Sequence, residues 1–147
     1  MPEQTDYFHM RCGVFLFLQR GSEILLALRQ NTGYADGLHG LVGGHLESGE
    51  TFSEAILREA KEEVGVEIDP QDLTQVHVMH RLDNIQTVNV FFTCSRWKGE
   101  VRNCEPNKCR EIAFFSKDAL PKTLTPFIRK ALHLIEEGIP FSELGFS

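Results

Sequence analysis

Three glutamates near the middle of the chain have the spacing of a divalent-cation site. Glu59, Glu62 and Glu63 lie three and four residues apart, so on a helix their carboxylates are neighbours on one face. Like charges at this spacing destabilise a helix, and a bound cation would compensate them. Carboxylates are the protein ligands that Mg²⁺ uses beside water and substrate phosphates. The pattern indicates a cation site that faces a phosphate chain, with a solvated helix face as the alternative.

The flanking residues predict the helix that carries these glutamates. Thr51 and Glu54 form a capping box, so the helix should begin just after Thr51. Gly65 is the residue type expected at a left-handed C-terminal stop. Apolar residues that recur every four positions predict the buried face: Phe52, Ile56, Ala60 and Val64. Glu59 and Glu63 fall at the edge of this face, which favours a site beside the core.

The segment from Gly44 to Val66 resembles the complete signature of the Nudix hydrolases. The matching residues, at the family's spacing, are Gly44, Glu50, Arg58, Glu59, Glu62, Glu63 and Gly65. Ala60 stands where the family usually has a larger aliphatic residue, and Val42 replaces a proline often found before the glycine pair. Neither departure falls on a metal-ligand position.

The resemblance implies a set of metal ligands. It makes Glu59 and Glu63 the principal ligands of Mg²⁺, with Mn²⁺ as a substitute, and lets Glu62 join directly or through water. A carbonyl at Gly43 or Gly44 would supply a further oxygen, because glycine lets the backbone approach an ion. The same glycine pair is expected to contact the substrate. The implied reaction is attack of water on phosphorus while the metals neutralise charge on the bridging and leaving oxygens.

Other site residues follow from the same resemblance. Glu50 is expected to pair with Arg58 and so to orient the carboxylates. The stretch from residue 97 to 105 resembles a segment of the MutT-like branch of the family, which gives Glu105 the role of a further metal ligand that could activate water. Arg29 falls where that branch has a substrate-contacting arginine. The alternatives are a solvated loop acid for Glu105 and a solubilising strand-end residue for Arg29. Aromatic residues that could stack on a base are Tyr34, Phe91 and Trp97.

The substrate is expected to be a (deoxy)nucleoside triphosphate, cleaved to the monophosphate and pyrophosphate. Leu82 stands where ADP-ribose hydrolases of the family tend to have a proline and dinucleoside-polyphosphate hydrolases a tyrosine. Leu124 replaces the purine-reading asparagine of the MutT-like branch, so specificity for oxidised guanine is not expected to transfer. The alternatives are a hydrolase of nucleotide sugars or dinucleoside polyphosphates, and a Nudix-fold sensor that binds a nucleotide without cleaving it.

The composition of the chain argues against some classes of partner. The chain has 147 residues, 41% of them hydrophobic, which predicts one domain, and the resemblance makes residues 1–147 a single Nudix hydrolase domain. The net charge of −6 argues against nucleic-acid binding. No apolar stretch approaches the length of a membrane span, and residues 1–6 do not resemble a signal peptide, so cytoplasm is the expected location. The expected partner is a small-molecule nucleotide. The resemblance also leaves a homodimer open, because dimers are common in the family.

The predicted elements give an α/β fold, an α/β/α sandwich with a mixed central sheet. The loop at residues 30–37 could cover the active site. A second helix should begin at Thr125-Pro126, where a cap precedes a proline at the first helical position, and end near Gly138. Strands are expected at residues 8–20, 23–29, near 41, 73–81, 86–96 and 112–115.

Overall fold

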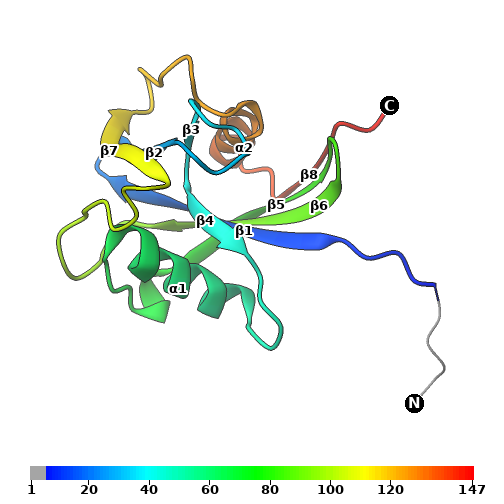
Figure 1. The fold of residues 1–147 in the computed structure, drawn as a ribbon, viewed down its shortest axis with the longest axis horizontal. Coiled ribbons are helices and arrows are strands. Elements are labelled where there is room, and N and C mark those ends of the chain that lie inside the picture. Colours follow the sequence, from blue (N-terminus) through cyan, green and yellow to red (C-terminus); the bar gives the residue numbers. More distant parts are fainter. Residues whose placement is uncertain (1–5) are drawn as a thin grey trace.

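The long strand β1 (Arg11–Arg20) is the centre of the sheet in the computed structural model, which describes residues 6–147. β1 pairs in parallel with β6 (Gln86–Cys94) and antiparallel with β4 (Val42–His45). Its last two residues pair with β2 (Glu23–Arg29), which also pairs with β3 (His39–Gly40) and β7 (Cys109–Ser116). Beyond β6 lie β5 (Thr74–Leu82) and the parallel edge strand β8 (Phe141–Leu144). Within the described residues the sheet has eight strands. It combines parallel and antiparallel pairs (Figure 1).

One helix packs on each face of the sheet. α1 (Phe52–Val64) and α2 (Pro126–Glu136) lie on opposite sides (Figure 1). Alternate residues of β1 point to opposite faces, so Leu16 belongs to the core beneath α1, whereas Phe17 belongs to the core beneath α2. The α/β/α sandwich predicted from the sequence is confirmed.

The ends of α1 are as predicted, and its buried face differs from the prediction only at Phe52, since Ile56, Ala60 and Val64 are buried. Thr51 Oγ1 accepts from the Glu54 N–H at 3.0 Å, and Glu54 Oε1 accepts from the Thr51 N–H at 2.8 Å. Gly65 ends the helix with a left-handed φ of 74°. Phe52, however, is 39% exposed, and Ala55 is buried in its place. As the first helical residue, Phe52 lies beyond the part of α1 that packs on the sheet.

Three boundaries or contacts differ from the sequence-based expectations. β1 begins at Arg11 rather than Phe8, because the ladder with β6 begins at the Arg11–Thr87 pair. α2 begins at Pro126, as expected, but Thr125 Oγ1 donates to the His39 carbonyl at 2.8 Å instead of capping the helix. The four-residue strand β8 was not predicted, since its pairing with β5 depends on tertiary position.

No helix among residues 6–147 combines the length and apolar character that crossing a membrane requires. Residues 1–5, on which the expected lack of a signal peptide depends, lie outside the described residues.

Candidate active site

Arg58 joins the middle of α1 to the loop before it. Its Nε donates to Glu50 Oε2 at 2.7 Å and its Nη2 to Glu50 Oε1 at 3.1 Å, a bidentate pair. Its Nη1 donates to Glu59 Oε1 at 2.7 Å and to Glu62 Oε2 at 3.4 Å. The bonds from Arg58, followed by one from the Glu47 N–H, lower the pKa of Glu50. The predicted Glu50–Arg58 pair is confirmed, and Arg58 also orients Glu59 and Glu62.

Glu63 has two other carboxylates beside it. Burial of its carboxyl group raises its pKa well above the ordinary value. A hydrogen bond to Glu59 and the charges of Glu59 and Glu105 raise the pKa further, whereas the Gly43 N–H, 3.5 Å from Glu63 Oε1, acts in the opposite direction. The three acids are therefore close enough to repel one another when all are ionised.

The glycine pair allows β4 to approach these acids. A Cβ at Gly44 would lie 2.5 Å from Glu59 Oε1, and one at Gly43 would collide with the Val14 carbonyl oxygen. Any larger residue at either position would displace a carboxylate or the neighbouring strand. The close approach explains why the sequence has glycine at both positions.

Hydrogen bonds between backbones hold the loop of Glu105 against the end of α1. The Cys104 N–H donates to the Glu63 carbonyl at 3.0 Å, which satisfies one of the carbonyls left without a helical partner. Farther along, the Cys109 N–H donates to the Glu105 carbonyl at 2.9 Å as β7 begins. The loop and the helix end therefore place Glu105 beside Glu63.

Arg29 is engaged within the loop that follows β2. Its Nε donates to the Tyr34 carbonyl at 2.9 Å and its Nη2 to Thr32 Oγ1 at 3.2 Å. Its guanidinium carbon lies 5.7 Å from the centroid of the Tyr34 ring, and Tyr34 is 51% exposed. These bonds use Nε and one hydrogen of Nη2, so the Nη1 donors and the second Nη2 hydrogen remain for a phosphate.

A cleft of about 670 Å³ brings most of the predicted site residues together. The predicted residues that line it are Arg29, Tyr34, Gly43, Gly44, Arg58, Glu59, Glu62, Glu63 and Glu105. Glu50 does not line it and lies behind Arg58. Phe91 is fully buried and Trp97 lines a separate recess with Phe114, so the idea that either stacks on a base was wrong.

The cleft also has a wall that sequence reasoning missed. It is formed by residues from β1, β5, β6 and α2: Phe15, Arg81, Thr87, Asn89 and Phe127. A polar Asn89 in the otherwise apolar run of β6 was the available signal, because a buried amide needs partners. Which strands lie side by side was not readable from the sequence.

The acidic residues have the chemistry of divalent-cation ligands, although their side chains do not converge on one point as the ligands of a bound metal would. Within residues 6–147, no three His, Cys, Asp or Glu side chains form a group that could hold a metal as they stand. Arg58 holds Glu59 and Glu62, and Glu63 resists ionisation beside its neighbours. A cation would remove that repulsion, and the donors are the oxygens that Mg²⁺ or Mn²⁺ accepts.

Comparisons with known proteins show the family and the fold. A NUDIX domain family model matches residues 8–135. The chain is 32% identical over 117 residues to an ADP-ribose pyrophosphatase of Methanocaldococcus jannaschii, covering 79% of this chain and 68% of that protein. It is 28% identical over 102 residues to an 8-oxo-dGTP diphosphatase of Proteus vulgaris, covering 69% and 88%. NudC-type NAD-capped RNA hydrolases also match, but the chain spans only 22% of one and 46% of another.

A solved structure shows the same fold. The crystal structure of a MutT NUDIX hydrolase from Burkholderia pseudomallei superposes with a TM-score of 0.79 and 29% identity, covering 86% of this chain and 98% of that one. Fold and site thus define a hydrolase that acts on phosphoanhydride bonds of nucleotides. The chain belongs to the Nudix family.

Proposed function

We propose that the protein is a metal-dependent pyrophosphohydrolase that cleaves a (deoxy)nucleoside triphosphate to the monophosphate and pyrophosphate, with residues 1–147 as one domain. The observation that carries the proposal is the placement of Glu63 beside Glu59 and Glu105 in the cleft. Clustered carboxylates with a raised pKa are typical of functional sites in which a ligand balances their negative charge. A bound cation would balance the charge of the carboxylates and would itself bind a phosphate chain.

Each site residue has a proposed role. Glu59, Glu63 and the Gly44 carbonyl would hold Mg²⁺, or Mn²⁺ in its place, with Glu62 and Glu105 as further ligands. When bound, the metal neutralises charge on the phosphate oxygens. Arg58 and Glu50 fix the direction of the carboxylates, and Glu105 accepts a proton from the attacking water. The contacts of Arg58 and the closeness of Glu63, Glu59 and Glu105 support these roles.

The remaining substrate-binding roles belong to residues at the rim of the cleft. We propose that the backbone of Gly43 and Gly44 lies against the phosphates, because only glycine leaves this strand open beside Glu59. Arg29 would bind a phosphate through its Nη donors, and Tyr34 would contact the nucleoside. Arg29 ends β2 and Tyr34 lies in the loop that follows, and both line the cleft.

A nucleotide sugar is the second candidate substrate. The relative from M. jannaschii is named an ADP-ribose pyrophosphatase, and it is 32% identical to this chain. Against it stands Leu82, which occupies the position where such hydrolases of the family tend to have proline. The name of the relative from P. vulgaris, an 8-oxo-dGTP diphosphatase, supports a triphosphate.

The test is a release assay with Mg²⁺ or Mn²⁺ over nucleoside triphosphates, nucleotide sugars and dinucleoside polyphosphates. Pyrophosphate from triphosphates supports the proposal, whereas cleavage confined to the other classes replaces the substrate. Absence of hydrolysis with every substrate and both metals would favour a sensor that binds nucleotides.

Replacement of Glu63 by Gln assigns the activity to this site. We expect kcat to fall at least about a hundredfold, because the variant removes a metal ligand while the side-chain size is kept. Glu67→Gln is the matched control, since Glu67 lies on the surface and pairs with Lys61. Unchanged activity of the Glu63 variant would remove Glu63 from the site.

A further inference from the structure

Arg81 has an incomplete set of hydrogen bonds in the cleft. It lies near the end of β5, and its side chain is only 12% exposed. Among residues 6–147, its Nε is the one buried side-chain nitrogen or oxygen with no hydrogen-bond partner. Buried polar groups nearly always have a partner, so this donor requires an explanation. A ligand in the cleft would supply the acceptor.

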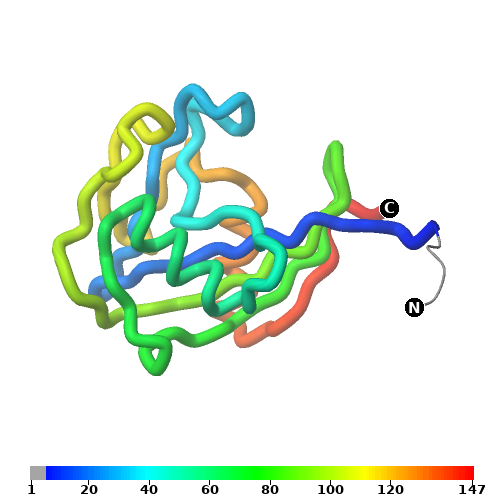
Figure 2. The backbone as a smooth tube through the Cα atoms, turned by 60° about the horizontal axis from the view of Figure 1, so that its bottom comes forward, coloured from blue at the N-terminus to red at the C-terminus, as the bar shows by residue number. Residues whose placement is uncertain are grey.

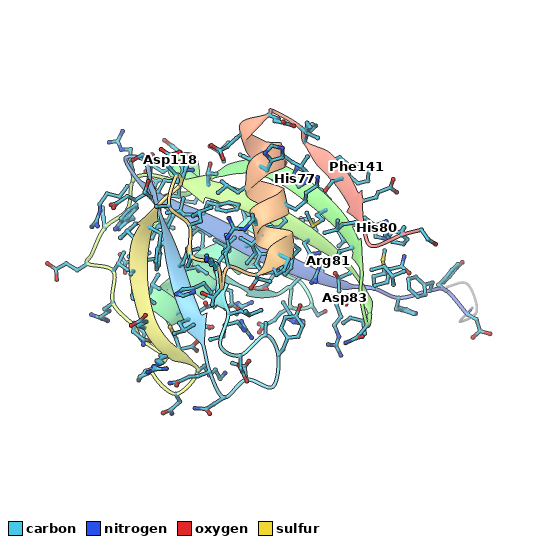
Figure 3. The ribbon with its side chains drawn as sticks, turned by 90° about the horizontal axis from the view of Figure 1, so that it is seen from above. His77, His80, Arg81, Asp83, Asp118 and Phe141 are labelled. Atoms are coloured by element: carbon cyan, nitrogen blue, oxygen red, sulfur yellow. The ribbon has the colours of Figure 1, made fainter. Side chains whose placement is uncertain are left out.

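The neighbours of Arg81 hold its guanidinium group in place. The Nη1 donates to Asp83 Oδ2 at 2.6 Å and to the Tyr34 hydroxyl at 3.4 Å. The guanidinium carbon lies 3.8 Å from the centroid of the Phe127 ring, and Figure 3 shows Arg81 and Asp83 beside the first turn of α2. Because these contacts use Nη1 and one face, the edge formed by Nε and Nη2 can donate two parallel hydrogen bonds.

The distance between Arg81 and the glycine pair is comparable to the length of a nucleotide. The strand register sets Gly44 beside Val14, then Val90, then Val78, and Arg81 is three residues farther along β5. With about 4.8 Å between neighbouring strands and about 3.3 Å per residue along β5, the backbones of Gly44 and Arg81 lie about 17 Å apart, and the Arg81 side chain spans part of this distance. This separation suits a nucleotide whose phosphates lie at the glycine pair and whose base lies at Arg81.

The surroundings favour a nucleobase over a second phosphate at this end of the cleft. Asp83 already balances the charge of Arg81 and itself lines the cleft, so an anion would meet a carboxylate. Phe15, which is partly exposed, also lines the cleft and offers aromatic surface to a flat ring, while Phe127 holds the guanidinium group of Arg81. Asn89, 2% exposed, adds a fixed amide whose nitrogen donates to the Met79 carbonyl at 3.3 Å.

We propose that Arg81 is a specificity-determining residue that reads a base with two adjacent acceptors, as guanine presents with O6 and N7. The inference rests on the proposed function, because it requires a nucleotide whose phosphates lie at the glycine pair. Adenine presents an acceptor beside a donor, which does not match two donors. In 8-oxoguanine the N7 carries a hydrogen, so the same edge of Arg81 disfavours the oxidised base.

Kinetic comparison of Arg81 variants tests the proposal. The wild type should cleave dGTP with a kcat/KM at least about tenfold above that for dATP or 8-oxo-dGTP, mainly through KM. Arg81→Met, which has no donors, and Arg81→Lys, which keeps the charge but not the two parallel N–H donors, should both lose this preference. Arg110→Met, on an exposed position of β7 outside the cleft, should keep it. A preference that is absent in the wild type, or unchanged in Arg81→Met, would overturn the proposal.

Binding measurements separate this inference from the hydrolase function. Calorimetry with GMP and AMP in EDTA needs no turnover, and GMP should bind more tightly to the wild type than to Arg81→Met. Tighter binding of GMP by the wild type supports recognition of guanine by Arg81 even if no triphosphate is hydrolysed. Absence of hydrolysis would contradict only the proposed function. Equal weakening of GMP and AMP, together with a lowered melting temperature, would show a purely structural Arg81 and overturn the inference.

Discussion

The Glu59 carboxylate packs directly against the backbone of the glycine pair, so its position depends on the absence of a side chain there. A Cβ at Gly44 would lie 2.5 Å from Glu59 Oε1 and 2.6 Å from its Cδ. Glu59 cannot retreat freely, because its Oε1 also accepts from Arg58 Nη1 at 2.7 Å. The carboxylate is confined between a strand and a guanidinium group.

Gly44→Ala is therefore expected to reduce kcat by about a hundredfold, since a displacement of about 1 Å at a reacting centre has effects of that size. Steady-state kinetics at saturating metal measures the loss. Gly40→Ala is the steric control for the fold, because the nearest atom to its Cβ would be Arg29 Cδ at 3.7 Å. Its melting temperature should match that of the wild type. Full activity of Gly44→Ala would mean that Glu59 is not held as described.

Two loops from distant parts of the sequence lie side by side at the rim of the cleft. The loop at residues 30–37 and the loop that carries Glu105 are neighbours in Figure 2. The Gln30 Nε2 donates to the Pro106 carbonyl at 2.8 Å, and the Asn31 Nδ2 donates to the Asn107 carbonyl at 3.1 Å. These bonds connect the loop of Tyr34 to the loop of Glu105. The predicted position of the first loop over the site agrees with the cleft residues that it supplies.

The capping box of α1 gives a prediction about stability alone. Thr51→Ala should lower the free energy of unfolding by about 1 kcal/mol, because it leaves the Glu54 N–H without its acceptor. Thr51→Ser keeps the hydroxyl and should retain most of the stability. Urea unfolding measures both changes. The carboxylates lie in later turns of α1, so a large loss of kcat in Thr51→Ala would show that the start of the helix also shapes the site.

Across the whole molecule, His39 joins the sheet to the segment that leads into α2. Its backbone N–H donates to the Thr123 carbonyl at 2.8 Å, and its Nδ1 lies 2.7 Å from Thr123 Oγ1. The ring is 9% exposed and packs edge-on against Phe115. Burial lowers the pKa of His39, while the charge of Glu111 raises it by a smaller amount. The fold therefore favours the neutral ring.

This shift makes the stability of the molecule dependent on pH. A histidine whose folded pKa is lower than its unfolded pKa contributes stability that is present above the unfolded value, about 6.5, and is lost as pH falls toward the folded value. We expect the wild type to lose stability relative to His39→Gln as the pH falls from 7.5 to 5.5, since the raised pKa of Glu63, which acts in the opposite direction, is common to both proteins. Parallel urea titrations of the two proteins at several pH values would measure the difference. Identical pH dependence would exclude His39 as the cause.

Local patterns predicted the elements that depend on neighbouring residues. The Thr51–Glu54 capping box and Gly65 set the ends of α1, and Pro126 marked the start of α2. Strand β8 was missed because a strand of four residues carries almost no periodicity of its own. Phe52 was misplaced because helical periodicity does not say where along the helix the packed region begins.

The sequence alone determined the family, the sandwich and the cluster of acids on α1, because helix spacing and capping are local properties of the chain. Only the tertiary structure decided what faces that cluster. It placed Glu105 beside Glu63 through bonds between the loop and the helix end, and it used two donors of Arg29 to hold the loop that follows β2. It also brought Arg81 and Phe127, 46 residues apart in the sequence, into contact in one cleft. Such neighbours arise from strand order and register, which are fixed by packing across the whole sheet and not by any short stretch of residues.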